Sequence, residues 1–354
     1  MKKKLLALTL TAAMALGVLS GCGGRSAQES SAPPETTPPA ETTAQPAETP
    51  EAGTVRMAVL NGPTGVGAAK LMEDSEAGTT ANHYEVEVFT DNSQVSAALT
   101  NGDVDIAAMA SNVAANLYNK SNGDIQLISV SGLGVLYILE NGDEVQSMAD
   151  LEGRTLYATG QGANPEYVLT YLLAENGVDP SGVDIQWLTA QEISTLMASG
   201  EADLCMLPVP AATSVLVQNG DVREALDLSA EWDALNNGSR LTMTTIVART
   251  GFAEENPQAV ENFLEDYAAS VEFMNDPANA GLTEGATPAQ LAVKYGFVAN
   301  EAIAEAAIPK CALTCITEAN DMRRAIQGYY EVLYQANPDS IGGAVPDDGF
   351  YYGA

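Results

Sequence analysis

Three short segments rich in glycine, asparagine and hydroxyl groups hold the side chains best suited to bind a small molecule. The segments are Asn61–Gly65, Ser111–Asn112 and Gly160–Asn164. Each follows an apolar run typical of a strand and precedes a run typical of a helix, with Pro165 well placed to start one. The N–H groups and partial positive charge of a helix start can hold an anion without a lysine. We therefore expect a binding site at these segments, although each alone could be only a turn and a helix cap.

Side chains typical of catalysis and of metal binding are sparse. His83 is the only histidine, and we expect it at the surface in the turn before Tyr84. The sequence has no Cys-x-x-Cys, His-Glu-x-x-His, Gly-x-x-x-x-Gly-Lys-Ser/Thr or Gly-x-Ser-x-Gly pattern. The carboxylates fall where solvated helix faces and caps would place them, so no zinc or calcium site can be read. The sequence thus predicts a protein that is not an enzyme and has no metal or cofactor.

The elements that would position the three segments alternate between strand and helix. Strands are expected at Val55–Leu60, Glu85–Phe89 and Asp105–Met109, and helices lie between and after them over residues 65–72, 94–101 and 113–118. This order is the βαβ pattern of a parallel sheet, whose ligands bind outside the carboxyl ends of the strands.

The same order returns about 100 residues further on. Thr155–Gly162 repeats the hydrophobic pattern and the glycine of Val55–Gly62, and residues 183–188 repeat the second strand. Asn101–Ile106 and Ser199–Leu204 both carry Gly, an acid, any residue and Asp between a helix and a strand. Three matching units in one order indicate two lobes of related build.

We predict an α/β fold of two lobes, each a βαβ sheet flanked by helices and joined to the other by two crossing strands. Lobe I would comprise residues 54–140 and 241–354, and lobe II residues 141–240. The chain would cross near 137–145 and near 237–243. The rest of lobe I would be a strand and four helices: Leu241–Arg249, a helix from Pro257 with apolar residues facing one side, and helices near 288–295, 301–307 and 322–334.

Arginines and aromatic residues supply further candidates for the pocket. Arg154, Arg240 and Arg249 could present a guanidinium, although Arg240 could also be a solvated turn residue beside the second crossing. Four rings could stack on a ligand or pack in the core: Tyr137, Tyr157, Trp187 and Trp232.

The first fifty residues indicate export. Three lysines at positions 2–4 precede an apolar run from Leu5 to Leu19, shorter than the ~20 apolar residues of a membrane-spanning helix. Residues 1–21 would be a signal peptide, and the Leu-Ser-Gly-Cys ending at Cys22 resembles the lipobox of bacterial lipoproteins. An ordinary signal with an incidental cysteine is the alternative. Beyond the lipidated Cys22, residues up to 53 are rich in Ser, Thr, Pro, Glu and Ala and would form a disordered tether.

The negative charge of the chain excludes some classes of binding partner. With 15 basic and 47 acidic side chains the formal charge is −32. Removal of the signal peptide takes three lysines, and 12 minus 47 leaves −35. Such a surface repels nucleic acid and anionic lipid, so we expect neither as a partner. It also means that a bound anion must be held by local donors.

Three cysteines remain besides Cys22. Cys205 lies in an apolar run and is expected in the core. Cys311 and Cys315 could form a disulfide on one helical turn, but in an extended strand they would be ~13 Å apart, beyond disulfide reach.

Six segments together resemble a known family over about residues 54–354: Asn61–Gly65, Asn101–Ala107, Asp150–Leu156, Gly160–Glu166, Leu207–Pro210 and Ile341–Asp348. The sequence is similar to solute-binding proteins of ABC importers, of the nitrate/taurine/sulfonate type that also includes binders of thiamin-precursor pyrimidines. Relatives usually carry Glu-Pro where this chain has Val209-Pro210, so a carboxylate contact of the family is missing here.

The resemblance implies a periplasmic-binding-protein-like (type II) fold whose lobes close by hinge motion around a small molecule. It implies a monomer, anchored by an acyl group such as palmitate at the extracytoplasmic face of the cell membrane, that delivers its solute to an ABC permease. The solute could be a sulfonate, a nitrate-like anion, a pyrimidine or another vitamin-like compound. A pyrimidine-precursor synthase, which would need an active-site histidine and a cysteine-rich motif, and a tethered solute sensor are the alternatives.

The expected ligand contacts come from the loops that closure would bring together and from the returning crossing. They are Asn61, Gly62, Pro63, Thr64, Gly65, Ser111, Asn112, Gly160, Gln161, Gly162, Ala163, Asn164, Pro208, Val209, Thr242 and Met243.

Overall fold

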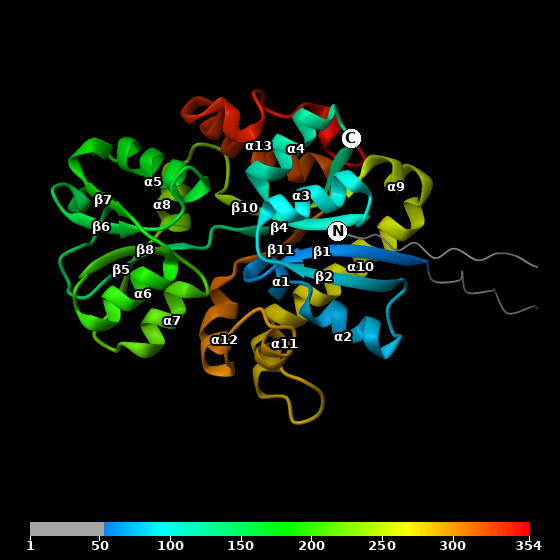
Figure 1. Ribbon diagram of the computed structural model, residues 1–354, viewed down its shortest axis with the longest axis horizontal. Helices are drawn as coiled ribbons and strands as arrows, with labels where there is room; N and C mark the ends of the chain where they lie inside the picture. Colours follow the sequence, from blue (N-terminus) through cyan, green and yellow to red (C-terminus); the bar gives the residue numbers. More distant parts are fainter. Residues whose placement is uncertain (1–52) are drawn as a thin grey trace, which may run out of the picture. The chain divides into compact units, whose positions relative to one another are not determined.

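Two mixed β-sheets flanked by helices lie side by side in the computed structural model, which describes residues 53–354 (Figure 1). This arrangement confirms the predicted α/β fold with two lobes. The signal peptide predicted over residues 1–21, Cys22 and the tether up to residue 52 lie outside the described residues. Within the described range, no helix has the length and apolar character needed to cross a membrane.

The sheet of lobe I has six strands. They are β1 (Thr54–Leu60), β2 (His83–Phe89), β3 (Ile106–Ala110), β4 (Ile125–Leu133), β10 (Thr242–Arg249) and β11 (Leu313–Ile316). Their order is β11-β4-β10-β3-β1-β2. β1 pairs in parallel with β2 and β3, whereas β10 is antiparallel to both β3 and β4.

The sheet of lobe II has five strands. They are β5 (Leu136–Glu140), β6 (Thr155–Ala158), β7 (Asp184–Trp187), β8 (Leu204–Pro208) and β9 (Arg223–Asp227), in the order β7-β6-β8-β5-β9. β6 is parallel to β7 and β8, and β5 is antiparallel to β8 and β9. The parallel core β7-β6-β8 thus repeats β2-β1-β3 of lobe I, which confirms the duplication inferred from the sequence.

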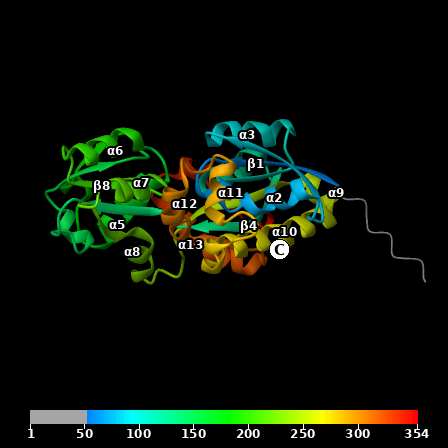
Figure 2. The same cartoon turned by 90° about the horizontal axis from the view of Figure 1, so that it is seen from below.

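Helices cover both faces of each sheet. In lobe I they are α1 (Pro63–Val66), α2 (Ala69–Ala77), α3 (Asn92–Asn101), α4 (Ser111–Ser121), α9 (Thr250–Glu255), α10 (Pro257–Asn275), α11 (Pro288–Lys294), α12 (Glu301–Ala307) and α13 (Ala319–Ala336), with short 3-10 turns η3 (Pro277–Gly281), η4 (Ile308–Lys310), η5 (Pro338–Ile341) and η6 (Asp348–Phe350). In lobe II they are α5 (Asn164–Glu175), α6 (Ala190–Ser199), α7 (Ala211–Gln218) and α8 (Leu228–Ala234), with η1 (Met148–Leu151) and η2 (Pro180–Gly182). Figure 1 shows α6 and α7 below the lobe II sheet and α5 and α8 above it, and Figure 2 shows the molecule from below.

The predicted helix from Pro257 is α10, and it shows how the pattern selects the core. Pro257 occupies its first turn, where the missing N–H costs nothing. Val260, Phe263 and Tyr267 follow at helical spacing and are buried against the lobe I core. The apolar stripe therefore faces inward, as predicted.

The first crossing between the lobes lies earlier than predicted. β5, over residues 136–140, pairs with β8 and β9 of lobe II, so the chain crosses between Leu133 and Leu136 and not within 137–145. Residues 136–140 therefore belong to lobe II. The apolar run continues through the crossing, so the hydrophobic pattern does not show where the chain crosses. At the crossing the backbone of Gly134 passes close to Ser229: a Cβ on this glycine would lie 2.1 Å from the Ser229 hydroxyl oxygen. The return runs between α8 and β10, over residues 235–241, and overlaps the predicted 237–243.

Candidate functional site

A cavity of about 630 Å³ is lined by residues of both lobes. Its walls come from the segments that follow β1 and β3 in lobe I and β6 and β8 in lobe II, which are the carboxyl ends of the parallel strands. Ligands of open parallel sheets bind at this edge. The volume is in the range of sites for small molecules, ~300–1,000 Å³.

The lobe I wall is fixed by hydrogen bonds within its own loops. Gly62 takes a φ of 92°, a left-handed conformation that favours glycine. The Thr64 hydroxyl donates to the carbonyl of Leu60 at 2.9 Å, so this lining residue closes the turn after β1. The Asn92 side-chain oxygen accepts from the Ala110 N–H at 2.9 Å and ties the start of α3 to the end of β3.

The lobe II wall is formed by the starts of three helices. Ala163, Asn164 and Pro165 begin α5, and Val209 and the residues after it lead from β8 into α7. The side chain of Glu166 accepts from the Gly162 N–H at 2.5 Å, which fixes the glycine loop before α5. Ala190, at the start of α6, completes this wall.

Four of the helix starts at the cavity have no side-chain cap. One belongs to the single turn α1, whose N-cap residue is Gly62. The others are those of α4, α5 and α7, whose N-cap residues are Ala110, Ala163 and Pro210. By contrast, α3 is capped by Asp91 and α6 by Thr189. A helix start without a cap leaves N–H groups that need another acceptor, together with a partial positive charge. Both lobes therefore present such N–H donors to the cavity.

None of the described residues that line the cavity is charged or aromatic. The polar lining is made of asparagine, threonine and serine side chains, while Val113, Val135, Met243, Val298 and Ile303 contribute much of the apolar surface. This composition contrasts with the formal charge of −32 on the chain. The cavity therefore combines neutral hydrogen-bonding side chains with an aliphatic surface.

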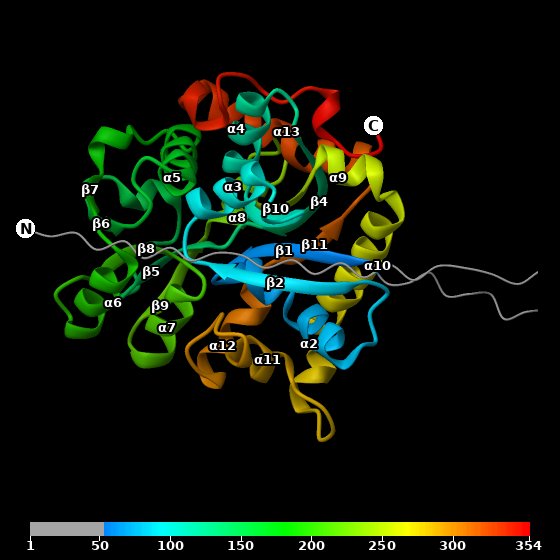
Figure 3. The same ribbon diagram turned by 45° about the vertical axis from the view of Figure 1, so that its right-hand side comes forward.

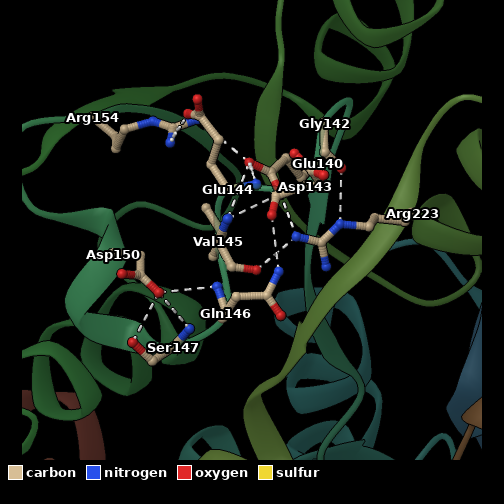
Figure 4. A network of polar contacts seen from close by, with 10 residues as sticks. All are labelled: Glu140, Gly142, Asp143, Glu144, Val145, Gln146, Ser147, Asp150, Arg154 and Arg223. Atoms are coloured by element: carbon tan, nitrogen blue, oxygen red, sulfur yellow. Dashed lines mark hydrogen bonds and ion pairs between the residues drawn. The ribbon is translucent and has the colours of Figure 1, made fainter.

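Two buried carboxylates, Glu140 and Asp105, pair with two of the three arginines that were candidates for the cavity. Glu140, 1% exposed, accepts from Arg223 Nη2 at 2.5 Å and from Arg154 Nη2 at 3.5 Å (Figure 4). It also accepts from the Val145 N–H at 3.2 Å, which fixes the loop after β5. This network lies at the amino ends of the parallel strands of lobe II, away from the lining residues.

In lobe I the buried carboxylate that pairs with arginines is Asp105. It accepts from Arg56 Nη2 and Arg249 Nη2, each at 2.6 Å. Burial alone would raise the pKa of this carboxyl, but the hydrogen bonds from the two arginines outweigh burial and lower the pKa below its usual value. Arg154 and Arg249 are thus structural, and Arg240 is exposed; none of these three predicted candidates lines the cavity.

Asn164 carries one of the two buried side-chain polar atoms that lack a hydrogen-bond partner among the described residues; the other is the Ser229 hydroxyl. Asn164 is the first residue of α5 and is 4% exposed, and the atom without a partner is its Oδ1. A buried polar group without a partner costs about 1–3 kcal/mol. Such groups in a native structure call for an explanation, and this one lines the cavity.

The structure places ten of the sixteen predicted contacts on the cavity wall. They are Asn61, Gly62, Pro63, Thr64, Asn112, Ala163, Asn164, Pro208, Val209 and Met243. The other six are Gly65, Ser111, Gly160, Gln161, Gly162 and Thr242, and they do not line it.

Each of the six has another position or partner. A Cβ on Gly65 would lie 2.2 Å from the Phe297 ring, so this glycine permits close packing. The Ser111 hydroxyl donates to the Thr242 carbonyl at 2.8 Å, and the Thr242 hydroxyl donates to the Ala325 carbonyl at 3.0 Å. In the glycine loop before α5, Gln161 and Gly162 are exposed and Gly160 is half-buried. Ser111 also does not cap α4 as predicted, because it is the first residue inside the helix.

Fourteen further lining residues were not predicted. They are Leu60, Asn92, Ala110, Val113, Val135, Pro165, Ala190, Pro210, Ala211, Ser214, Thr244, Val298, Ala299 and Ile303. Many are direct neighbours of predicted residues or occupy the first turn of a helix after a strand, so the strand-end rule could have found them. Val298, Ala299 and Ile303 reach the cavity from the α11–α12 connection and from α12, and no sequence signal places them there.

The remaining candidates lie outside the cavity. Trp232 is fully buried, with ring centroids of Tyr171 and Tyr329 at 4.9 and 5.6 Å, so it belongs to the core. His83 is exposed at the start of β2 and not in the turn before it. The other three predicted stacking rings, Tyr137, Tyr157 and Trp187, also lie off the cavity wall.

The cysteines offer neither a disulfide nor a reactive thiol. Cys205, Cys311 and Cys315 are all free. Burial raises the pKa of the Cys205 and Cys311 thiols to about 12. Over residues 53–354, no group of three or more histidine, cysteine, aspartate or glutamate residues could hold a metal ion.

Side chains also join the lobes on both sides of the cavity. Lys310 of η4 contacts Glu224 of β9 at 2.5 Å and lies 4.9 Å from the ring centroid of Tyr137 in β5. On the other side, the Asn337 amide donates to the Tyr167 hydroxyl at 2.9 Å. Helix α12 contacts α7, as Figure 3 also shows. The lobes are thus in contact in this structure.

Comparison with known proteins places the chain in a family. The family model described as NMT1/THI5 like matches residues 90–280, more than half of the chain. Among curated proteins, none is a significant match to the sequence.

Solved structures share the fold at low identity. An ABC transporter from Parabacteroides distasonis has a TM-score of 0.69 and 22% identity, over 84% of this chain and 98% of that one. The periplasmic aliphatic sulphonate binding protein SsuA from Escherichia coli has a TM-score of 0.63 and 17% identity, over 84% and 94%. The alkanesulfonate-binding protein SsuA from Xanthomonas axonopodis pv. citri, bound to MOPS, has a TM-score of 0.58 and 15% identity, over 84% and 96%. These likenesses establish the two-lobed, periplasmic-binding-protein-like fold.

Proposed function

Because the chain belongs to the NMT1/THI5-like family, we propose that it is the extracytoplasmic solute-binding component of an ABC importer. It captures one small molecule between its lobes and delivers it to a permease in the membrane. The observation that carries this proposal is the cavity lined by both lobes, with the uncapped starts of α4, α5 and α7 at its wall. We propose the ten predicted residues on its wall as ligand contacts.

The chemistry of the cavity supports binding and not catalysis. The described lining residues include no histidine, cysteine, lysine or carboxylate that could transfer a proton or attack a substrate. The uncapped helix starts instead favour an anionic or strongly dipolar group. Two of the similar structures are sulfonate-binding proteins by name, which supports an anion-type solute here.

Closure of the lobes would trap the solute. The chain passes between the lobes at 133–136 and 235–241, and two such connections allow a hinge. We infer an open state in which the contacts between Lys310 and Glu224 and between Asn337 and Tyr167 are broken. Solute binding then favours the closed state because the walls of both lobes contact the ligand.

We further propose that residues 1–21 are removed and that an acylated Cys22 anchors a monomer to the membrane through the tether at 22–53. The anchor would keep the solute-binding lobes near the permease. Replacement of Cys22 with alanine should release the protein from the membrane fraction without changing its solute affinity. Retention of the Cys22→Ala variant at the membrane would contradict lipid anchoring at this residue.

Thermal denaturation of the purified protein tests solute binding. We expect one class among aliphatic sulfonates, carboxylates, nitrate, bicarbonate and pyrimidines to raise the melting temperature. At 100 times Kd a ligand stabilises the folded state by about 2.7 kcal/mol, or roughly 4 °C for a folded body of this size. If none of these solutes changes the melting temperature, the proposed function fails.

A further inference from the structure

The backbone of Gly134 and the side chain of Ser229 meet where the chain first passes between the lobes. Ser229 lies in the first turn of α8 in lobe II, and its N–H donates to Asp227 Oδ1 at 2.8 Å, which fixes its position. A Cβ on Gly134 would lie 2.1 Å from the Ser229 hydroxyl oxygen and 2.8 Å from Leu241 Cδ2 in the return crossing. The glycine therefore allows the first crossing to lie against both α8 and the second crossing.

The Ser229 hydroxyl is buried at this contact without a hydrogen-bond partner among the described residues. Other hydroxyls at the crossings are satisfied. Ser239 accepts a hydrogen bond from Trp232 Nε1 at 3.3 Å. The Thr242 hydroxyl donates to the Ala325 carbonyl at 3.0 Å. A buried hydroxyl without a partner raises the free energy of the state that buries it, so the contact with the first crossing is unfavourable for Ser229.

This cost belongs to the closed arrangement of the lobes. The lobes contact each other in this structure through Lys310 and Glu224, so the buried hydroxyl is a feature of that state. Opening requires rotation within the crossings at 133–136 and 235–241. Such rotation moves Gly134 relative to α8, which belongs to lobe II, and lets water reach the Ser229 hydroxyl.

Resting on the proposed function, we propose that the Ser229 hydroxyl, covered by Gly134 on closure, biases the lobes toward the open state. The solute has to offset this cost when it closes the lobes, so its affinity is lower than the contacts of the cavity wall alone would give. The same cost favours reopening and so shortens the time for which the solute is held. Neither residue lines the cavity, so both act through the equilibrium between the lobes and not through contact with the solute.

Calorimetric titration and stopped-flow kinetics of the full-length protein in detergent test the inference. The probes are butanesulfonate, hexanoate, nitrate, bicarbonate and cytosine, one for each class in the thermal test. Ser229→Ala should tighten binding of the probe that the wild type binds best by about 5- to 30-fold, because the closed state no longer buries an unpaired hydroxyl. The change should appear mainly as slower dissociation.

Gly134→Ala should have the opposite effect, because its Cβ would overlap the Ser229 hydroxyl in the closed state. The loss of affinity should be smaller in the Ser229→Ala background, since two residues in contact do not act additively. Ser194→Ala is the matched control: its hydroxyl, in α6 of lobe II, donates to the Ala190 carbonyl at 2.8 Å, and its removal should leave affinity unchanged.

A higher melting temperature of Ser229→Ala with unchanged affinity would show that the hydroxyl is a cost to the fold alone. That result would overturn the inference and leave the proposed function standing. Weaker binding by Ser229→Ala, or additive effects of the two substitutions, would do the same. If Gly134→Ala does not fold, the affinity of Ser229→Ala decides. Binding of none of the five probes by the wild type would refute the proposed function and the inference with it.

Discussion

Lys310 provides the sharpest test of lobe closure, because it joins the lobes without lining the cavity. Its ammonium contacts Glu224 at 2.5 Å and lies over the Tyr137 ring, both in lobe II. The pair is about one-third exposed on each side, so the ion pair contributes about 0.5–1 kcal/mol. The cation–π contact adds about 0.5–1 kcal/mol. Lys310→Met keeps the aliphatic stem and should remove about 1–2 kcal/mol from the closed state.

That loss corresponds to roughly a 5- to 30-fold weaker apparent affinity, since 1.4 kcal/mol is a factor of ten. The lobes make this contact only once they close on the solute, so the change should fall mainly on the dissociation rate. Stopped-flow measurement of the association and dissociation of a solute bound by the wild type separates the two rates. At the same subsaturating solute concentration, small-angle X-ray scattering should show a larger mean radius of gyration for the variant than for the wild type, because less of the variant is closed.

Lys294→Met is the matched control. Lys294 pairs with Glu73 and, at 2.8 Å, with Glu76, and it lies 4.8 Å from the Tyr295 ring centroid. All of these residues belong to lobe I, so this variant loses the same kinds of contact without affecting closure. Equal losses of affinity in both variants, or none in Lys310→Met, would refute the closure argument. A double-mutant cycle with Glu224→Gln measures the part that belongs to the ion pair.

Three further substitutions test the framework around the site. Glu140→Gln should cost about 2–3 kcal/mol of unfolding free energy in urea, at the low end for a broken buried pair because its arginines are about one-third exposed and can turn to water. The lowered pKa of Asp105 contributes stability that is present above the unfolded-state pKa of about 3.9 and is lost as the pH falls through the folded-state pKa. Thermal scans should therefore show that acidification lowers the melting temperature of Asp105→Asn less than that of the wild type. Gly65→Ala should cost about 1–3 kcal/mol, measured by denaturation, because its Cβ would overlap the Phe297 ring.

The duplicated fold could be predicted from sequence because its signals are local. Strand runs, the glycine after each first strand and the Gly-acid-x-Asp segments each lie within a few residues. They predict parallel strands and the repeat of the βαβ units, which is enough to place the loops at one edge of each sheet. The strand order β2-β1-β3 and its repeat β7-β6-β8 are seen only in the structure. The same rule brought ten predicted residues to the cavity wall.

What could not be predicted depends on contacts between distant segments. Ile303 lines the cavity only because α12 packs back across the edge of lobe I against α7. The sequence predicts the first crossing between the lobes a few residues too late, because Val135 and β5 are as apolar as β4 and the pattern shows no break between them. The sequence predicts Ser111 and Thr242 as ligand contacts, but neither lines the cavity, and the Ser111 hydroxyl at the start of α4 donates to the Thr242 carbonyl. A side chain of the right type at the right edge can still serve the fold alone.

In both lobes the paired charges lie at the edge of the sheet opposite the cavity, and this shared arrangement follows from the duplicated fold. In lobe I, Asp105 gathers Arg56 and Arg249 at the amino end of β3. In lobe II, Glu140 gathers its arginines beside the amino end of β8, the counterpart of β3. At the opposite, carboxyl ends of these strands, α4 and α7 begin without a cap. Buried carboxylates thus pair with partly exposed arginines at one edge of each sheet, whereas the described residues that line the cavity at the other edge are neutral. A solute recognised there is selected by hydrogen-bond geometry and shape, so exchange of a neutral lining residue for a charged one should alter specificity more than any change to the paired arginines.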